Sequence, residues 1–99
     1  LILKNIKNTD KVVLLDERGK TFTSINWSKE IEKEIICGTK SLVFIVGGAY
    51  GFAQTIYDRA DAKLSLSSMT FSHQIIRLFF IEQLYRAFTI IKGEPYHNE

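Results

Sequence analysis

The sequence predicts an α/β fold with a mainly parallel sheet, and three observations support that prediction. Short apolar runs of strand length recur along the chain, and a segment with helical spacing follows each of them. Strands that alternate with helices are typical of parallel sheets flanked by helices. The expected elements are strand 11–16, a helix from 24 to the turn at 37–40, strand 41–46, helix 52–60, strand 63–67 and helix 72–91.

The totals fit one ordinary domain, expected to span residues 1–99. Apolar residues make up 45% and charged residues 24% of the chain. A net charge of +2 is too small to indicate nucleic-acid binding by itself. The single cysteine, Cys37, excludes an internal disulfide and suits a reducing compartment, so we expect a cytoplasmic protein. No apolar run approaches the ~20 residues of a membrane span, and the cysteine and histidines lack metal-ligand spacing.

The first half of the chain opens with helical spacing at 1–6 that reads as the tail of a longer helix, so the chain is expected to be a truncation. A turn cluster at 8–10 precedes the first strand, whose run KVVLLD is bounded by charges and is expected to be buried. The segment 17–20 reads as a turn. Ser24 is expected to cap the helix that follows.

The long helix after Ser72 has an unusual distribution of side chains. Ser72 is the expected N-cap, because its hydroxyl can accept a free N–H of the first turn. The segment 78–81 has four apolar residues in a row, which point to all sides of a helix at ~100° per residue. The polar residues also change face along the helix. This pattern suits a helix that lies between its own domain and a partner.

Three loops leave the carboxyl ends of the expected strands. They are the loop after Asp16, the glycine loop at 47–51 and the serine turn at 64–70. Ligands of parallel sheets bind at the carboxyl ends of strands. We therefore expect the three loops to meet at one site.

Two of these loops have a composition that suits ligand binding. The loop GGAYG at 47–51 lets a ligand approach the backbone closely, although a plain tight turn explains it as well. It matches neither a dinucleotide fingerprint nor a Walker loop. The turn LSLSSMT at 64–70 offers backbone groups and hydroxyls that can read the edge of an adenine ring. Its alternative interpretation is a helix-capping loop with Met69 in the core.

The ionisable candidates lie on the long helix and the tail. His73 suits a structural histidine or a catalyst, and Arg86 lies four residues after Glu82, so a helix-surface ion pair also explains it. Tyr96 can stack on a base, and His97 can contact a phosphate or an imide proton.

The segments LSLSSMTFSHQIIR and EQLYRAFTIIKGEPYH resemble the ribosomal RNA large subunit methyltransferase H family of the SPOUT superfamily. The resemblance implies a mainly parallel sheet flanked by helices, a C-terminal trefoil knot and a homodimer that completes the site. It also implies a further strand-helix-strand region in family members, ahead of the part that this chain matches.

The resemblance implies S-adenosylmethionine as cofactor, held in a bent conformation by backbone groups of three knot loops. The glycine loop departs from the GGPEG-like family pattern, which puts its polar contact in doubt and leaves the backbone contacts possible. The positions carried over are Leu15, Gly47, Leu66, Ser67, Ser68, Met69, Thr70 and Phe71.

The implied reaction is methylation at N3 of a pseudouridine in large-subunit ribosomal RNA, on the free subunit or the assembled ribosome. Arg86 is assigned to the phosphate or the developing imide anion, and Tyr96 to the nucleobase. His97 is the expected proton acceptor. The alternative is a truncated, non-catalytic dimeric module that binds the ribosome or its RNA and has kept the fold.

Overall fold

A computed structural model describes residues 5–47, 52–67 and 69–98 of the chain. Residues 1–4 of the expected helix at 1–6 lie outside the described residues. The elements, in chain order, are β1 (Lys11–Thr21), α1 (Ser24–Ile36), β2 (Leu42–Val46), α2 (Gln54–Arg59), β3 (Ala62–Ser65) and α3 (His73–Lys92).

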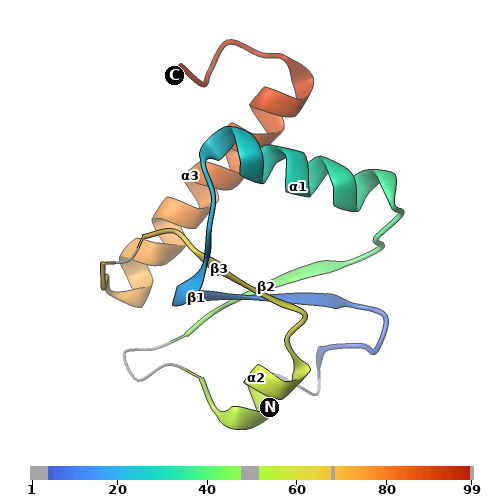
Figure 1. Cartoon of the computed structure of the whole chain (residues 1–99), viewed down its shortest axis with the longest axis vertical. Helices are drawn as coiled ribbons and strands as arrows, with labels where there is room; N and C mark the ends of the chain where they lie inside the picture. The colour runs from blue at the N-terminus through green and yellow to red at the C-terminus, as the bar shows by residue number, and fades with distance from the viewer. Residues whose placement is uncertain (1–4, 48–51, 68, 99) are drawn as a thin grey trace.

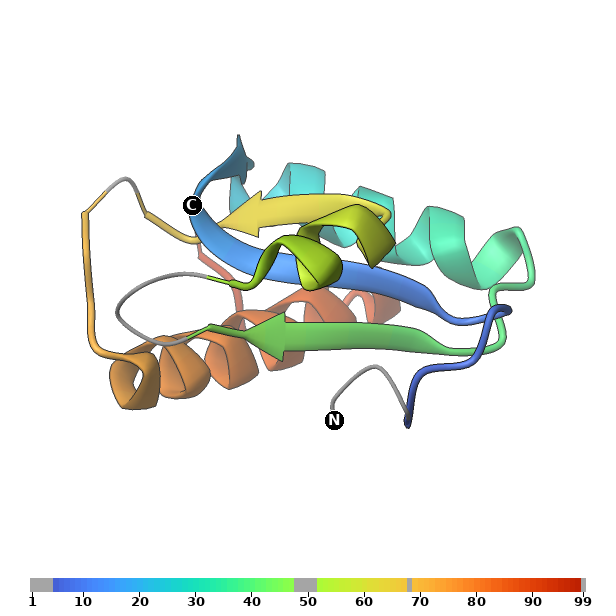
Figure 2. The same cartoon turned by 90° about the horizontal axis from the view of Figure 1, so that it is seen from below.

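The described strands form one parallel sheet in the order β2-β1-β3, which confirms the predicted class (Figure 1). Helices α1 and α3 cover one face and α2 covers the other, as Figure 2 shows from a second direction. Crossovers between parallel strands are right-handed. The chain steps from β1 to β2 in one direction and from β2 past β1 to β3 in the other, so α1 and α2 must lie on opposite faces.

The central strand β1 supplies both halves of the core because its side chains alternate between the two faces. Val13 and Leu15 pack toward α1 and α3, whereas Val12 and Leu14 pack toward α2. The part of the core that lies between the sheet and helices α1 and α3 also contains an aromatic cluster of Trp27, Phe44 and Phe80. The ring centroids of Phe44 and Phe80 lie 6.2 Å and 5.8 Å from that of Trp27. This cluster fixes α1 and α3 on the sheet.

Two local expectations are wrong. The expected turn at 17–20 lies within β1, which pairs with β3 up to Thr21. The register with β3 shifts between Leu15 and Lys20, so the intervening residues bulge out of the ladder. Thr23 rather than Ser24 caps α1, because its side chain accepts the Asn26 N–H at 3.1 Å.

Helix α3 begins and ends with well-formed caps. The Ser72 hydroxyl accepts the Ile75 N–H at 3.3 Å, which confirms the expected N-cap. Gly93 ends the helix in the left-handed conformation that glycine adopts without strain. Helix α3 buries Phe80 and Ala87 against its own domain, and several large apolar side chains remain exposed on it. They are Ile75, Leu78, Phe79, Ile81, Tyr85 and Phe88.

Candidate functional site

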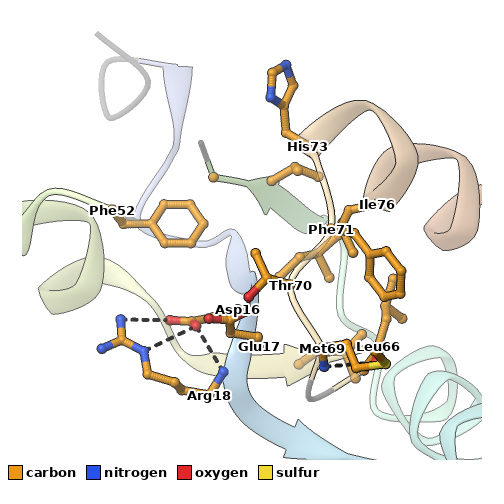
Figure 3. A pocket seen from close by; sticks show the side chains of 15 residues that line it. Asp16, Glu17, Arg18, Phe52, Leu66, Met69, Thr70, Phe71, His73 and Ile76 are labelled. Atoms are coloured by element: carbon orange, nitrogen blue, oxygen red, sulfur yellow. Dashed lines mark hydrogen bonds and ion pairs between the residues drawn. The ribbon is translucent and has the colours of Figure 1, made fainter. Parts of the chain in front are cut away.

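A cavity of about 330 Å³ lies at the carboxyl ends of all three strands (Figure 3). Its size falls within the range of roughly 300–1,000 Å³ that is usual for small-molecule sites. The lining residues come from the end of β1 and its bulge, the end of β2, the segment before α2, the serine turn and the start of α3. They are Leu15, Asp16, Glu17, Arg18, Val46, Gly47, Phe52, Leu64, Leu66, Ser67, Met69, Thr70, Phe71, His73 and Ile76.

The three expected loops therefore meet in the part of the chain that the structure describes. Seven of the eight positions carried over for the methyl donor line this cavity: Leu15, Gly47, Leu66, Ser67, Met69, Thr70 and Phe71. Ser68 and the rest of the glycine loop, 48–51, lie outside the described residues. The convergence follows from the topology, since parallel strands bring their carboxyl ends to one edge of the sheet.

Gly47 lies directly against the Phe52 ring, which would have to shift to make room for a side chain. A Cβ built on Gly47 would lie 2.8 Å from the tip of the Phe52 ring. Phe52 lines the cavity and packs edge-on against Tyr57 of α2, with ring centroids 5.6 Å apart. The glycine thus allows the aromatic wall of the cavity to lie directly against the end of β2.

The serine turn is held by its own hydroxyl groups. The Ser65 hydroxyl donates to the Ser67 carbonyl at 2.8 Å, and the Met69 N–H donates to the Ser67 hydroxyl at 3.0 Å. Met69 is 69% exposed, so the alternative with Met69 in the core is wrong. Phe71 packs edge-on against Phe79, with centroids 5.4 Å apart. The turn therefore presents both polar groups and apolar side chains to the cavity.

A hydrogen-bonded carboxylate, that of Asp16, lies at the end of β1. It accepts the Tyr57 hydroxyl at 2.9 Å and the Arg18 backbone N–H at 3.0 Å. Burial acts to raise the pKa of Asp16, but these hydrogen bonds and the Arg18 guanidinium together outweigh it and lower the pKa. The carboxyl group is consequently ionised at neutral pH.

One hydrogen bond joins two walls of the cavity. The Thr70 hydroxyl of the serine turn donates to the Glu17 carboxylate of the β1 bulge at 2.5 Å. Figure 3 shows both side chains at the centre of the cavity and His73 directed away from them. The bulge and the serine turn are thus coupled through their side chains.

The three expected catalytic residues form a second cluster, at the carboxyl end of α3. The Arg86 guanidinium lies 2.9 Å from both the Glu82 carboxylate and His97 Nδ1. It also stacks on the Tyr96 ring, with its Cζ 5.0 Å from the centroid. The Tyr96 hydroxyl donates to Glu82 at 3.1 Å, and this bond raises the Tyr96 pKa above its ordinary value. The expected ion pair of Arg86 with Glu82 is therefore present, and the tail folds back onto it.

The second cluster is remote from the cavity within one chain. Ten positions of α3 separate Arg86 from Ile76, the cavity-lining residue nearest to it on this helix, which is about 15 Å at 1.5 Å per helical residue. Arg86, Tyr96 and His97 do not line the cavity. The structure thus brings the expected donor positions together and the expected catalytic positions together, in two separate places.

Several residues of the cavity lining were not expected from the sequence, notably Asp16, Glu17 and Phe52. Asp16 and Glu17 directly follow Leu15, and an acidic pair at the carboxyl end of a buried strand is a signal that could have identified them. Phe52 follows the glycine loop, and its role depends on its contact with Gly47, which sequence spacing does not indicate.

In the ranges 5–47, 52–67 and 69–98, no group of three or more His, Cys, Asp or Glu side chains is placed to hold a metal ion. In the same ranges, no helix has the length and apolar character needed to cross a membrane.

Comparison with known proteins gives a consistent result. The family described as "Predicted SPOUT methyltransferase" matches residues 1–97. Proteins called ribosomal RNA large subunit methyltransferase H are similar to the whole chain: that of Flavobacterium johnsoniae is 59% identical over 99 residues, and that of Christiangramia forsetii is 60% identical over 98 residues. The chain spans 63% and 62% of those two proteins, less than two thirds of their length. A parallel sheet flanked by helices fits this family, and the chain belongs to the SPOUT methyltransferases.

Proposed function

We propose that the chain is the donor-binding and catalytic part of an S-adenosylmethionine-dependent methyltransferase that acts on N3 of a pseudouridine in large-subunit ribosomal RNA. The observation that carries this proposal is the cavity where seven of the eight expected donor positions meet. The printed names of the relatives, which specify the large-subunit RNA, support the substrate. Such a reaction would take place in the cytoplasm.

The cavity has the features that an adenosyl group requires. Apolar side chains of Leu15, Leu66 and Ile76 can hold the faces of the adenine ring. The serine turn can offer backbone groups to the ring edge. We propose that Leu15, Gly47 and 66–71 hold the donor, and that 64–71 and α3 form the C-terminal trefoil knot of the fold. When bound, the sulfonium supplies an activated methyl group.

The catalytic cluster would act from the partner protomer of a homodimer. A distance of about 15 Å along α3 keeps Arg86 from reaching the donor cavity of its own chain. The exposed apolar face of α3 lies between the two places and offers a surface for a second copy. Antiparallel pairing of two such helices would bring each cluster to the other chain's cavity.

The rate of methyl transfer depends mainly on the alignment of the donor's methyl carbon with the ring nitrogen. The Tyr96 hydroxyl stays protonated because its pKa is raised, so we assign it to base positioning rather than proton removal. A guanidinium can only donate hydrogen bonds, so His97 accepts from Arg86 at Nδ1. If Arg86 turns to the phosphate or the developing imide anion, Nδ1 can accept the imide proton.

The test is methyl transfer to ribosomes that lack the modification, with Arg86→Ala and His97→Ala as separate variants. Each is expected to lower turnover by about 10²-fold or more, the usual loss for a general base or a charge-stabilising group. Donor affinity measured by calorimetry should stay nearly unchanged. Lys29→Ala, which removes an exposed positive charge from α1, is the matched control and should keep its turnover.

Two results would contradict the proposal. Unchanged turnover in both variants would remove Arg86 and His97 from the mechanism. Binding of ribosomal RNA without measurable affinity for the donor would instead support a non-catalytic module that has kept the fold.

A further inference from the structure

The carboxylate of Asp16 is the most enclosed ionisable group of the cavity among the described residues. Its side chain is 7% exposed, whereas that of its ion-pair partner Arg18 is 73% exposed. The Arg18 side chain extends away from the serine turn, and the Asp16 carboxylate lies between its guanidinium and Thr70 (Figure 3). The negative charge therefore lies inside the cavity and the positive charge lies at its outer side.

Inside the cavity, the carboxylate of Asp16 has a stronger electrostatic effect than the guanidinium of Arg18. Water and salt screen the exposed guanidinium much more strongly than the enclosed carboxylate. The guanidinium contacts both carboxylate oxygens, Nε to Oδ1 and Nη2 to Oδ2, but each distance is 3.5 Å, which is long for an ion pair. Glu17, the other acidic residue of the lining, adds charge of the same sign. The cavity thus favours a cationic group near the end of β1.

Resting on the function proposed above, we propose that Asp16 makes the cavity select the cationic sulfonium donor over its neutral thioether product. In the reaction the methyl–sulfur bond breaks, the methyl group bonds to the ring nitrogen, and the imide proton passes to the base. The electron pair of the broken bond remains on sulfur, which becomes a neutral thioether. The product has then lost the charge that Asp16 attracts, so it leaves more readily than the donor.

Calorimetric titration with three ligands tests this selectivity. They are S-adenosylmethionine, S-adenosylhomocysteine, and sinefungin, which carries a protonated amine in place of the methylsulfonium. The wild-type chain should bind both cationic ligands more tightly than the neutral one. Asp16→Asn keeps the shape of the side chain, and it should reduce this preference about tenfold through weaker binding of the cations, with little change for the neutral ligand.

Two further variants separate charge from structure. Tyr57→Phe removes the hydroxyl that holds Asp16 but leaves its charge, so the preference should remain. Arg18→Ala removes the exposed positive charge and should raise the preference about twofold, a change of opposite sign that lost packing would not produce. Glu32→Gln, which removes a negative charge from the exposed face of α1, should leave the preference unchanged.

The possible failures are distinguishable. If the wild-type chain binds none of the three ligands, the proposed function fails and this inference fails with it. If it binds the donor but Asp16→Asn weakens all three ligands equally, or none of them, only the selectivity assigned to Asp16 is overturned.

Discussion

Single residues decide where the backbones of β1 and β3 can approach each other. A Cβ built on Gly19 would lie 2.7 Å from the Lys63 carbonyl carbon and 2.8 Å from the Leu64 nitrogen. These are backbone atoms of β3 and cannot move aside as a side chain can. Gly19 therefore allows the β1 bulge, which carries Asp16 and Glu17 into the cavity, to lie directly against β3.

Gly19→Ala is expected to destabilise the chain by about 2 kcal/mol, the usual cost of forcing extra volume into a packed place. It should also weaken donor binding, because the bulge forms one wall of the cavity. Urea unfolding and calorimetry measure the two effects. Gly38→Ala is the matched control: Gly38 has a φ of +78° and open space around it, so only backbone strain of about 1 kcal/mol should appear, with donor affinity intact. Equal losses of donor affinity in both variants would contradict this role of Gly19.

The ion pair of Lys11 and Glu34 ties the start of β1 to the last turn of α1. Glu34 accepts hydrogen bonds from Lys11 and from Thr39, and these lower its pKa, while the bond to Glu34 raises the pKa of Lys11. The stability from Glu34 is therefore present above its ordinary pKa of 4.5 and lost as the pH falls through the lowered value. The part from Lys11 is present below its ordinary pKa of 10.5 and lost as the pH rises through the raised value.

Glu34→Gln should therefore lower the free energy of unfolding at pH values between the lowered pKa of Glu34 and the raised pKa of Lys11. Below the lowered pKa of Glu34 the substitution should have little effect. The Lys11 side chain is 38% exposed, so solvent screening limits the loss to about 0.5 kcal/mol at pH 7. Urea unfolding of both proteins at pH 7 and at about pH 3 should show a difference that shrinks in acid. A difference that stays constant across this range would mean that the charge of Glu34 is not its cause.

The existence and order of the elements were predictable, and their junctions were less so. KVVLLD and SLVFIV are continuous apolar runs because helices cover both faces of the parallel sheet, so the burial of these strands is visible in the sequence itself. The N-cap of α1 was placed one residue late, because Thr23 and Ser24 both carry a suitable hydroxyl. The Ser24 hydroxyl instead donates to Gln83 at 2.9 Å, a contact 59 residues away that local spacing does not reveal.

The outer face of helix α3 carries large apolar side chains that the described part of the chain does not cover. Leu78 is 62% exposed on this helix, and we expect it to lie in the proposed dimer interface. Leu78→Glu should convert a dimer to a monomer in light scattering, because a charge buried at an apolar interface is costly. The monomer should still bind the donor and should lose methyl transfer, since the cavity lies within one chain.

The control for that change is Ile36→Glu. Ile36 is 77% exposed on α1, at the end of the helix, so the same substitution there should leave the dimer and its activity intact. A Leu78→Glu protein that stays dimeric, or a wild-type chain that is monomeric at assay concentration, would contradict the proposed arrangement.

At the scale of the molecule, the direction of the strands determines where the site lies. The parallel pairing brings the carboxyl ends of β1, β2 and β3 to one edge, so the order of strands and helices predicted that the loop after Asp16, the glycine loop and the serine turn would meet. The resemblance to the family added the individual positions, such as Leu15. The bulge at 16–19 and the place of Phe52 depend on contacts between distant segments. They therefore became evident only from the three-dimensional arrangement.

The most direct test of the central claim, a donor cavity at the strand ends, is a titration of the isotopically labelled chain with S-adenosylmethionine followed by amide NMR shifts. The account predicts saturable shifts at Leu15, Gly47 and the serine turn, and in the Leu78→Glu monomer it predicts much smaller shifts around Arg86 and Tyr96. Absence of saturable shifts, or shifts centred on the carboxyl end of α3 instead of the strand ends, would contradict it.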